Sequence, residues 1–147
     1  MEDTYLNFIR LLNEEGIEYV VIGGHAVILH GYIRATTDLD LLIATSTENA
    51  NRMLTVMLKF GFGPYDFDLK DFIQKPSGVS FTMNFDKIEI LTEVLGITFE
   101  ECYKNHVVVE LDGVPVRMLG LSDLIKSKRA TGRAKDLADL DNLPQLE

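Results

Sequence analysis

The 147-residue chain contains a single cysteine, no tryptophan and only four prolines. One cysteine, Cys102, can form no disulfide within the chain and cannot build a cysteine-rich zinc site. This composition is typical of proteins in a reducing compartment, so we expect a cytoplasmic protein. Long apolar runs are also lacking, whereas a membrane span needs about 20 consecutive apolar residues. The acidic start, Met1–Thr4, does not resemble a secretory signal, so we expect no contact with a membrane.

Basic residues are scarce, since 14 lysines and arginines face 23 acidic residues and leave a net charge of −9. Sequence-independent binding of nucleic acid needs an excess of positive charge on the contact face. The charge therefore excludes a general binder of the nucleic-acid backbone, although a local basic site remains compatible with it. The chain has 46% hydrophobic and 25% charged residues, shows no repeat or flexible linker, and has the length of one globular domain.

Apolar spacing predicts an alternation of helices and strands. The predicted helices cover 4–15, 25–30, 47–60, 99–105, 122–131 (capped by Ser122) and 133–140, with one helical turn inside a loop at 63–76. The predicted strands cover 18–22, 38–44, 79–83, 87–92, 106–111 and 114–119. Asp112-Gly113 is a strong hairpin signal and requires an antiparallel pair. We therefore predict an α+β fold, a mixed sheet with helices packed mainly on one side.

Two aspartates on the second predicted strand are the most informative residues. Side chains alternate between the faces of a strand, so Asp38 and Asp40 project from one face and Leu39, Leu41 and Ile43 form a core stripe on the other. Two neighbouring carboxylates repel each other unless a cation lies between them, and Mg²⁺ prefers oxygen ligands. A solvated pair of aspartates at the start of a strand is the alternative interpretation.

A third carboxylate is expected from a later strand. Ile88 and Ile90 face the core, so Glu89 faces the opposite way, whereas Asp86 and Glu93 lie at the strand ends and rank below it. Three carboxylates from two strands would form a two-metal site of the kind that supports phosphoryl or nucleotidyl transfer.

A glycine pair, Gly23-Gly24, follows the first predicted strand and opens a short helix. Glycines let the backbone approach a ligand closely, and the start of a helix attracts phosphate. A simple reversal of the chain is the alternative. The position of the pair before the two aspartates favours a phosphate cradle.

These motifs together resemble the polymerase-beta-like nucleotidyltransferase superfamily, and within it the small bacterial branch of toxin-type and uncharacterised nucleotidyltransferases. The resemblance covers roughly residues 17–140. It rests on four segments, Gly23-Gly24-His25-Ala26, Arg34-Ala35-Thr36-Thr37-Asp38-Leu39-Asp40, Asp123-Leu124-Ile125-Lys126-Ser127-Lys128 and Gly132-Arg133-Ala134-Lys135-Asp136.

The resemblance implies that residues 1–147 form one minimal nucleotidyltransferase domain. It implies an enzyme in which Asp38, Asp40 and Glu89 are catalytic and bind Mg²⁺, with Mn²⁺ as an alternative. The reaction would transfer a nucleoside monophosphate from a triphosphate such as ATP to a hydroxyl group, with release of pyrophosphate. The acceptor stays open between a protein side chain, the 3′ end of an RNA such as tRNA, and a small molecule.

A basic segment near the C-terminus supplies candidate phosphate ligands. Residues 124–135 contain five basic residues and no acid in an otherwise acidic chain. A clamp on the triphosphate is the functional interpretation, and a solvated helix face is the alternative. Lys128 matches the family position and is the first candidate for a phosphate ligand, and Arg133 is the second. Arg34 and Thr36 precede the aspartates and complete the predicted nucleotide-binding set with Gly23 and Gly24.

Two departures from the family pattern keep other functions open. Many relatives carry serine where this chain has Gly24, and the third acid is more usually aspartate than Glu89. Both departures favour a nucleotide-binding or regulatory module that has lost turnover. A toxin–antitoxin component that binds a partner protein is a further alternative.

Overall fold

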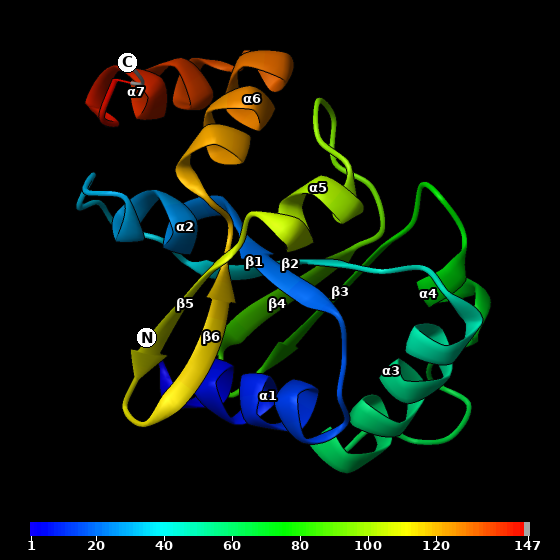
Figure 1. Cartoon of the computed structure of the whole chain (residues 1–147). Helices are drawn as coiled ribbons and strands as arrows, with labels where there is room; N and C mark the ends of the chain where they lie inside the picture. Colours follow the sequence, from blue (N-terminus) through cyan, green and yellow to red (C-terminus); the bar gives the residue numbers. More distant parts are fainter. Residues whose placement is uncertain (146–147) are drawn as a thin grey trace.

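The computed structural model describes residues 1–145 (Figure 1). The helices are α1 (Asp3–Glu14), α2 (Gly23–Leu29), α3 (Thr47–Phe60), α4 (Lys70–Ile73), α5 (Phe99–Lys104), α6 (Leu121–Thr131) and α7 (Ala134–Asn142). The strands are β1 (Tyr19–Ile22), β2 (Asp38–Ile43), β3 (Gly78–Met83), β4 (Asp86–Leu91), β5 (Val107–Leu111) and β6 (Val114–Met118). Among these helices, none has the length and apolar character needed to cross a membrane.

All six strands join one mixed sheet with the order β3-β4-β2-β1-β6-β5. The short link between β1 and β2 makes that pair antiparallel, and the turn at Asp112-Gly113 does the same for β5 and β6. The central pairs β2–β4 and β1–β6 are parallel. The predicted α+β fold with a mixed sheet is confirmed.

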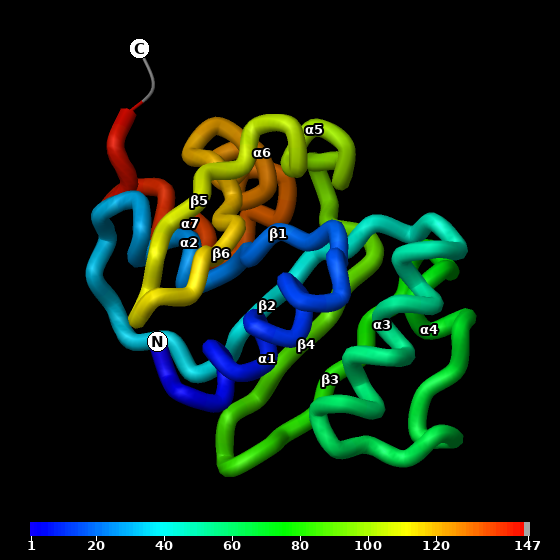
Figure 2. The backbone as a smooth tube through the Cα atoms, turned by 60° about the horizontal axis from the view of Figure 1, so that its bottom comes forward, coloured from blue at the N-terminus to red at the C-terminus, as the bar shows by residue number. Residues whose placement is uncertain are grey.

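Helices cover both faces of this sheet, so the expectation that they pack mainly on one side is wrong. Helices α1, α3 and α4 enclose a core on one face, and α2, α5, α6 and α7 enclose a second core on the other (Figures 1 and 2). The cause lies in β1, where Tyr19 and Val21 enter the first core and Val20 and Ile22 the second. A continuous apolar strand is buried on both faces.

The start of α6 also differs from the prediction. The helix begins at Leu121 after Gly120 and has no side-chain cap, so Ser122 does not cap it. A Cβ at Gly120 would lie 2.7 Å from the carbonyl oxygen of Asn105, so the close approach of these two segments requires glycine there. The helix ends at Gly132, whose left-handed backbone (φ 58°) lets α7 turn back against α6.

Candidate active site

The sheet brings the three predicted carboxylates to one place. Strands β2 and β4 are parallel neighbours, and Asp40 lies directly opposite Glu89 in their register. Leu39 and Leu41, like Ile88 and Ile90 across from them, point into the core below α1 and α3. The carboxylates therefore emerge on the opposite face of the sheet.

There they border a cleft of about 510 Å³, here called the main cleft. It lies between the strand ends, the turn after β4 and the α6–α7 pair. Its lining residues are Ile22, Gly23, Asp38, Asp40, Glu89, Leu91, Glu93, Val94, Leu95, Ile97, Leu124, Ser127, Lys128, Thr131, Arg133, Lys135 and Asp136.

Negative charge is concentrated around Asp40. Burial raises the pKa of the Asp40 carboxyl to about 6, and repulsion from Glu89 and Asp38 adds to the effect. Attraction to the cations Lys135 and Lys87 lowers this pKa and offsets part of the rise. The Lys87 ammonium lies 4.0 Å from a carboxylate oxygen of Asp38. The site thus holds more negative than positive charge, and a bound cation would relieve the repulsion.

The donor set suits a hard divalent cation that shares its ligands with a substrate. Within residues 1–145, no three His, Cys, Asp or Glu side chains are arranged to hold a metal by themselves. Mg²⁺ usually binds through one or two carboxylates together with substrate phosphates and water. Asp38 and Asp40 meet that requirement as a pair. A metal-binding role for Glu89 stays a prediction.

The two glycines are required by close approaches to the aspartate strand. Gly23 has a left-handed backbone (φ 70°), and a Cβ there would lie 2.3 Å from Oδ2 of Asp40. A Cβ on Gly24 would lie 2.4 Å from Oγ1 and 2.8 Å from Cβ of Thr36. Thr36 therefore occupies the space that a side chain at position 24 would need.

Beside these glycines lies a second hollow of about 200 Å³, here called the glycine recess. It is lined by Gly23, Gly24, Arg34, Ala35, Thr36, Thr37, Asp38, Asp40, Lys128, Arg133 and Lys135. All six residues predicted to bind nucleotide thus lie around one hollow next to the aspartates. Their contact with a nucleotide stays a prediction.

The loop that carries Arg34 and Thr36 is anchored from α1. The Tyr5 hydroxyl donates to the Thr37 carbonyl at 2.8 Å. The His25 ring packs edge-on against Tyr5 with centroids 5.6 Å apart, and burial lowers the pKa of this histidine. The His25 ring thus packs against the tyrosine that anchors this loop, and its Nε2 is buried without a hydrogen-bond partner among the described residues.

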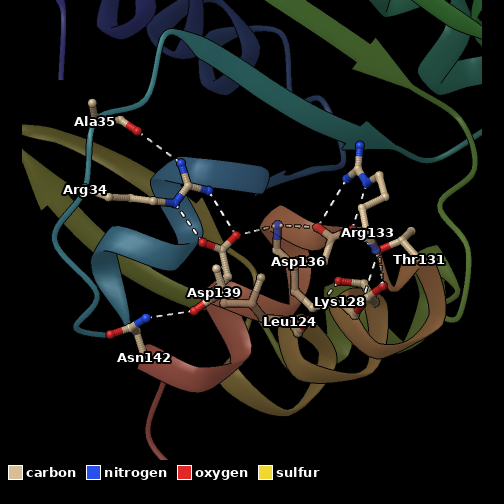
Figure 3. A network of polar contacts seen from close by, with 11 residues as sticks. Arg34, Ala35, Leu124, Lys128, Thr131, Arg133, Asp136, Asp139 and Asn142 are labelled. Carbon is tan, nitrogen blue, oxygen red and sulfur yellow. Dashed lines mark hydrogen bonds and ion pairs between the residues drawn. The ribbon is translucent and has the colours of Figure 1, made fainter.

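A buried network ties the basic residues to two aspartates of α7 (Figure 3). Lys128 is only 7% exposed, and its Nζ lies 3.2 Å from Oδ1 of Asp136 and 3.0 Å from Oδ2 of Asp139. Arg34 donates to both carboxylate oxygens of Asp139, at 2.8 and 3.1 Å. Arg133 donates from Nε to Asp136 at 2.7 Å. The network joins the loop before β2 to both C-terminal helices.

The two aspartates of this network are ionised. Burial by itself would raise the pKa of both carboxyls, but hydrogen bonds outweigh it. Arg133, Thr131 and Lys128 hold the pKa of Asp136 well below its usual range. Arg34 and Lys128 lower the pKa of Asp139. Much of the positive charge of Lys128 and Arg34 is therefore balanced within the protein.

Sequence reasoning missed two parts of the site. Lys135 lines both the main cleft and the glycine recess, although it was left out of the predicted set. Its place in the Gly-Arg-x-Lys-Asp segment was the available signal. Apolar residues around the turn after β4, chiefly Val94, Leu95 and Ile97, form the other part. No sequence motif marks that turn.

A mixed sheet with paired aspartates on one strand and a glycine turn packed against them is the arrangement expected of a nucleotidyltransferase-type domain. The family described as nucleotidyltransferase of unknown function (DUF6036) matches residues 5–144, and the chain belongs to this family. The predicted family resemblance is thus confirmed.

Solved structures agree at the level of the fold. A candidate nucleotidyltransferase from Thermotoga maritima has a TM-score of 0.64 and 18% identity, with 92% of this chain and 86% of that chain covered. An antigenic nucleotidyltransferase-like protein from Paracoccidioides brasiliensis has a TM-score of 0.55 and 18% identity, with coverage of 93% and 70%. No curated protein matches the sequence.

Proposed function

We propose that the protein transfers a nucleoside monophosphate from a nucleoside triphosphate such as ATP to a hydroxyl acceptor and releases pyrophosphate. The observation that supports this most is the placement of Asp38, Asp40 and Glu89 on adjacent strands beside the glycine recess. One bond forms and one bond breaks at the α-phosphorus in this reaction. The acceptor oxygen bonds to the α-phosphorus, the bond from that phosphorus to the α–β bridging oxygen breaks, and pyrophosphate leaves.

Each carboxylate has a role that follows from its position. Asp38 and Asp40 would hold a divalent cation, Mg²⁺ or alternatively Mn²⁺, that neutralises charge on the phosphates. Glu89 lies across the register from Asp40 and would accept the proton of the attacking hydroxyl. The recess between Gly23 and Lys135 would hold the pyrophosphate end, so catalysis would consist mainly of positioning and charge stabilisation.

A second candidate is a nucleotide-binding module with weak turnover. Gly24 offers no hydroxyl to the phosphates, and the described residues hold no ready-made cluster of three metal ligands. Such a module would bind the triphosphate in the same cleft and leave it intact.

Incubation with α-labelled triphosphates, Mg²⁺ or Mn²⁺ and a cell extract tests the proposal. We expect label transfer and pyrophosphate release, and we expect both to be lost in the Asp38→Asn/Asp40→Asn double variant. Asp112→Asn is the matched control, because it neutralises an aspartate in the β5–β6 turn whose left-handed backbone (φ 50°) suits asparagine. Triphosphate binding without pyrophosphate release would favour the module, and a protein that binds neither metal nor triphosphate would contradict both candidates.

A further inference from the structure

We infer that Lys135 is the residue that binds the β- and γ-phosphates of the triphosphate, and that buried Lys128 is a positioning residue that fixes α7 beneath it. This inference rests on the proposed function and assigns a ligand-binding role within that site. It reverses the expectation from sequence, which placed Lys128 first among the phosphate ligands.

Lys135 has the required position. Only three cationic residues among the described ones border both the main cleft and the glycine recess, and these are Lys128, Arg133 and Lys135. A triphosphate that extends from the carboxylates into the recess must pass all three.

Lys135 is also the most available of the three cations. Lys128 is buried against two carboxylates, and the Arg133 guanidinium is held by Asp136. None of the ion pairs found among residues 1–145 includes Lys135, and this residue is exposed. A lysine ammonium on a flexible stem can turn toward an incoming phosphate without breaking an existing ion pair.

The buried network fixes the position of Lys135 relative to the site. Asp136, the next residue, accepts hydrogen bonds from the Arg133 backbone at 3.1 Å and from the Thr131 hydroxyl at 2.7 Å. Lys128 binds the same carboxylate and that of Asp139, one turn further along α7. These contacts fix the first turn of α7 against α6, so the base of the Lys135 side chain stays beside the recess.

Isothermal titration of the whole protein tests this assignment with ATP, AMP and inorganic pyrophosphate as the probes. The variants are Lys135→Gln, Lys135→Arg and, as a control, Lys104→Gln, which removes the same charge from the exposed end of α5. We expect Lys135→Gln to weaken ATP and pyrophosphate binding roughly 10- to 100-fold, the range for a charged hydrogen bond, and to leave AMP binding unchanged. Lys135→Arg should restore most of the affinity, and Lys104→Gln should resemble the wild type.

Equal ATP affinity in the wild type and Lys135→Gln would overturn the inference while the proposed function stood. An equal loss for AMP and ATP would also overturn it, because it would indicate a structural effect or contact with another part of the nucleotide. Failure of the wild-type protein to bind ATP would contradict the proposed function and the inference together.

Discussion

The contact between Gly24 and Thr36 allows a quantitative test of why position 24 is a glycine. A methyl group added by Gly24→Ala would lie 2.4 Å from the Thr36 hydroxyl and 2.8 Å from its Cβ. The second atom is attached directly to the backbone, so the loop before β2 must move to make room. Overpacking of this kind costs about 1–3 kcal/mol.

Alanine also favours a helix more than glycine does, which offsets up to about 1 kcal/mol of that cost. We therefore expect Gly24→Ala to lower the free energy of unfolding by about 1–2 kcal/mol. In Thr36→Gly, which removes both close atoms, the same methyl group should cost little. The helix preference of alanine acts in both backgrounds and cancels, so the coupling between the two positions should equal the overpacking cost of about 1–3 kcal/mol, within the range for residues in contact.

Urea unfolding of the wild type, both single variants and the double variant measures this coupling, provided that the m values stay equal. The cycle removes the separate cost of Thr36→Gly, including the loss of its hydroxyl contact with the Asp38 carbonyl. Additive effects, or a Gly24→Ala variant as stable as the wild type, would refute the steric explanation for the glycine.

Two further predictions concern charge. The raised pKa of Asp40, about 6, means that the folded protein loses stability as pH rises from about 4 to about 6. Asp40→Asn should therefore raise the free energy of unfolding at pH 8 by about 3 kcal/mol and change it little at pH 4. Equal effects of this substitution at pH 4 and pH 8 would contradict the assignment to Asp40 ionisation. Lys128→Met should cost about 3 kcal/mol in urea unfolding, the low end for a broken buried pair, because Arg34 and Arg133 still contact the two aspartates. The exposed control Lys104→Met should stay within about 0.5 kcal/mol of the wild type, and an equally stable Lys128→Met would show that the network contributes little.

The carboxylate strands could be predicted because strand periodicity assigns faces directly. Because side chains alternate between the two faces of a strand, Asp38 and Asp40 lie on the face opposite Leu39 and Leu41. The same alternation places Glu89 on the face opposite Ile88 and Ile90. The pairing of Asp40 with Glu89 was beyond sequence reasoning, since it depends on β2 and β4 being parallel neighbours.

Whether each basic residue is buried or exposed could not be predicted, for a similar reason. A charge run on a helix looks the same whether it faces solvent or a partner helix. Lys128 is buried only because α7 turns back at Gly132 and brings Asp136 and Asp139 against it. The four helices of the second layer were predicted, but their packing on the opposite face of the sheet was not, because an apolar strand such as β1 does not show which helices cover each of its faces.

The fate of the individual phosphates of ATP tests the central claim most directly. The protein is supplied with a cell extract, Mg²⁺ and ATP labelled on either the α- or the γ-phosphate. We expect the α-label to appear on an acceptor and the γ-label to leave as pyrophosphate, with both events dependent on Asp38 and Asp40. Transfer of the γ-label to an acceptor, or transfer of the α-label by the Asp38→Asn/Asp40→Asn variant, would contradict the account.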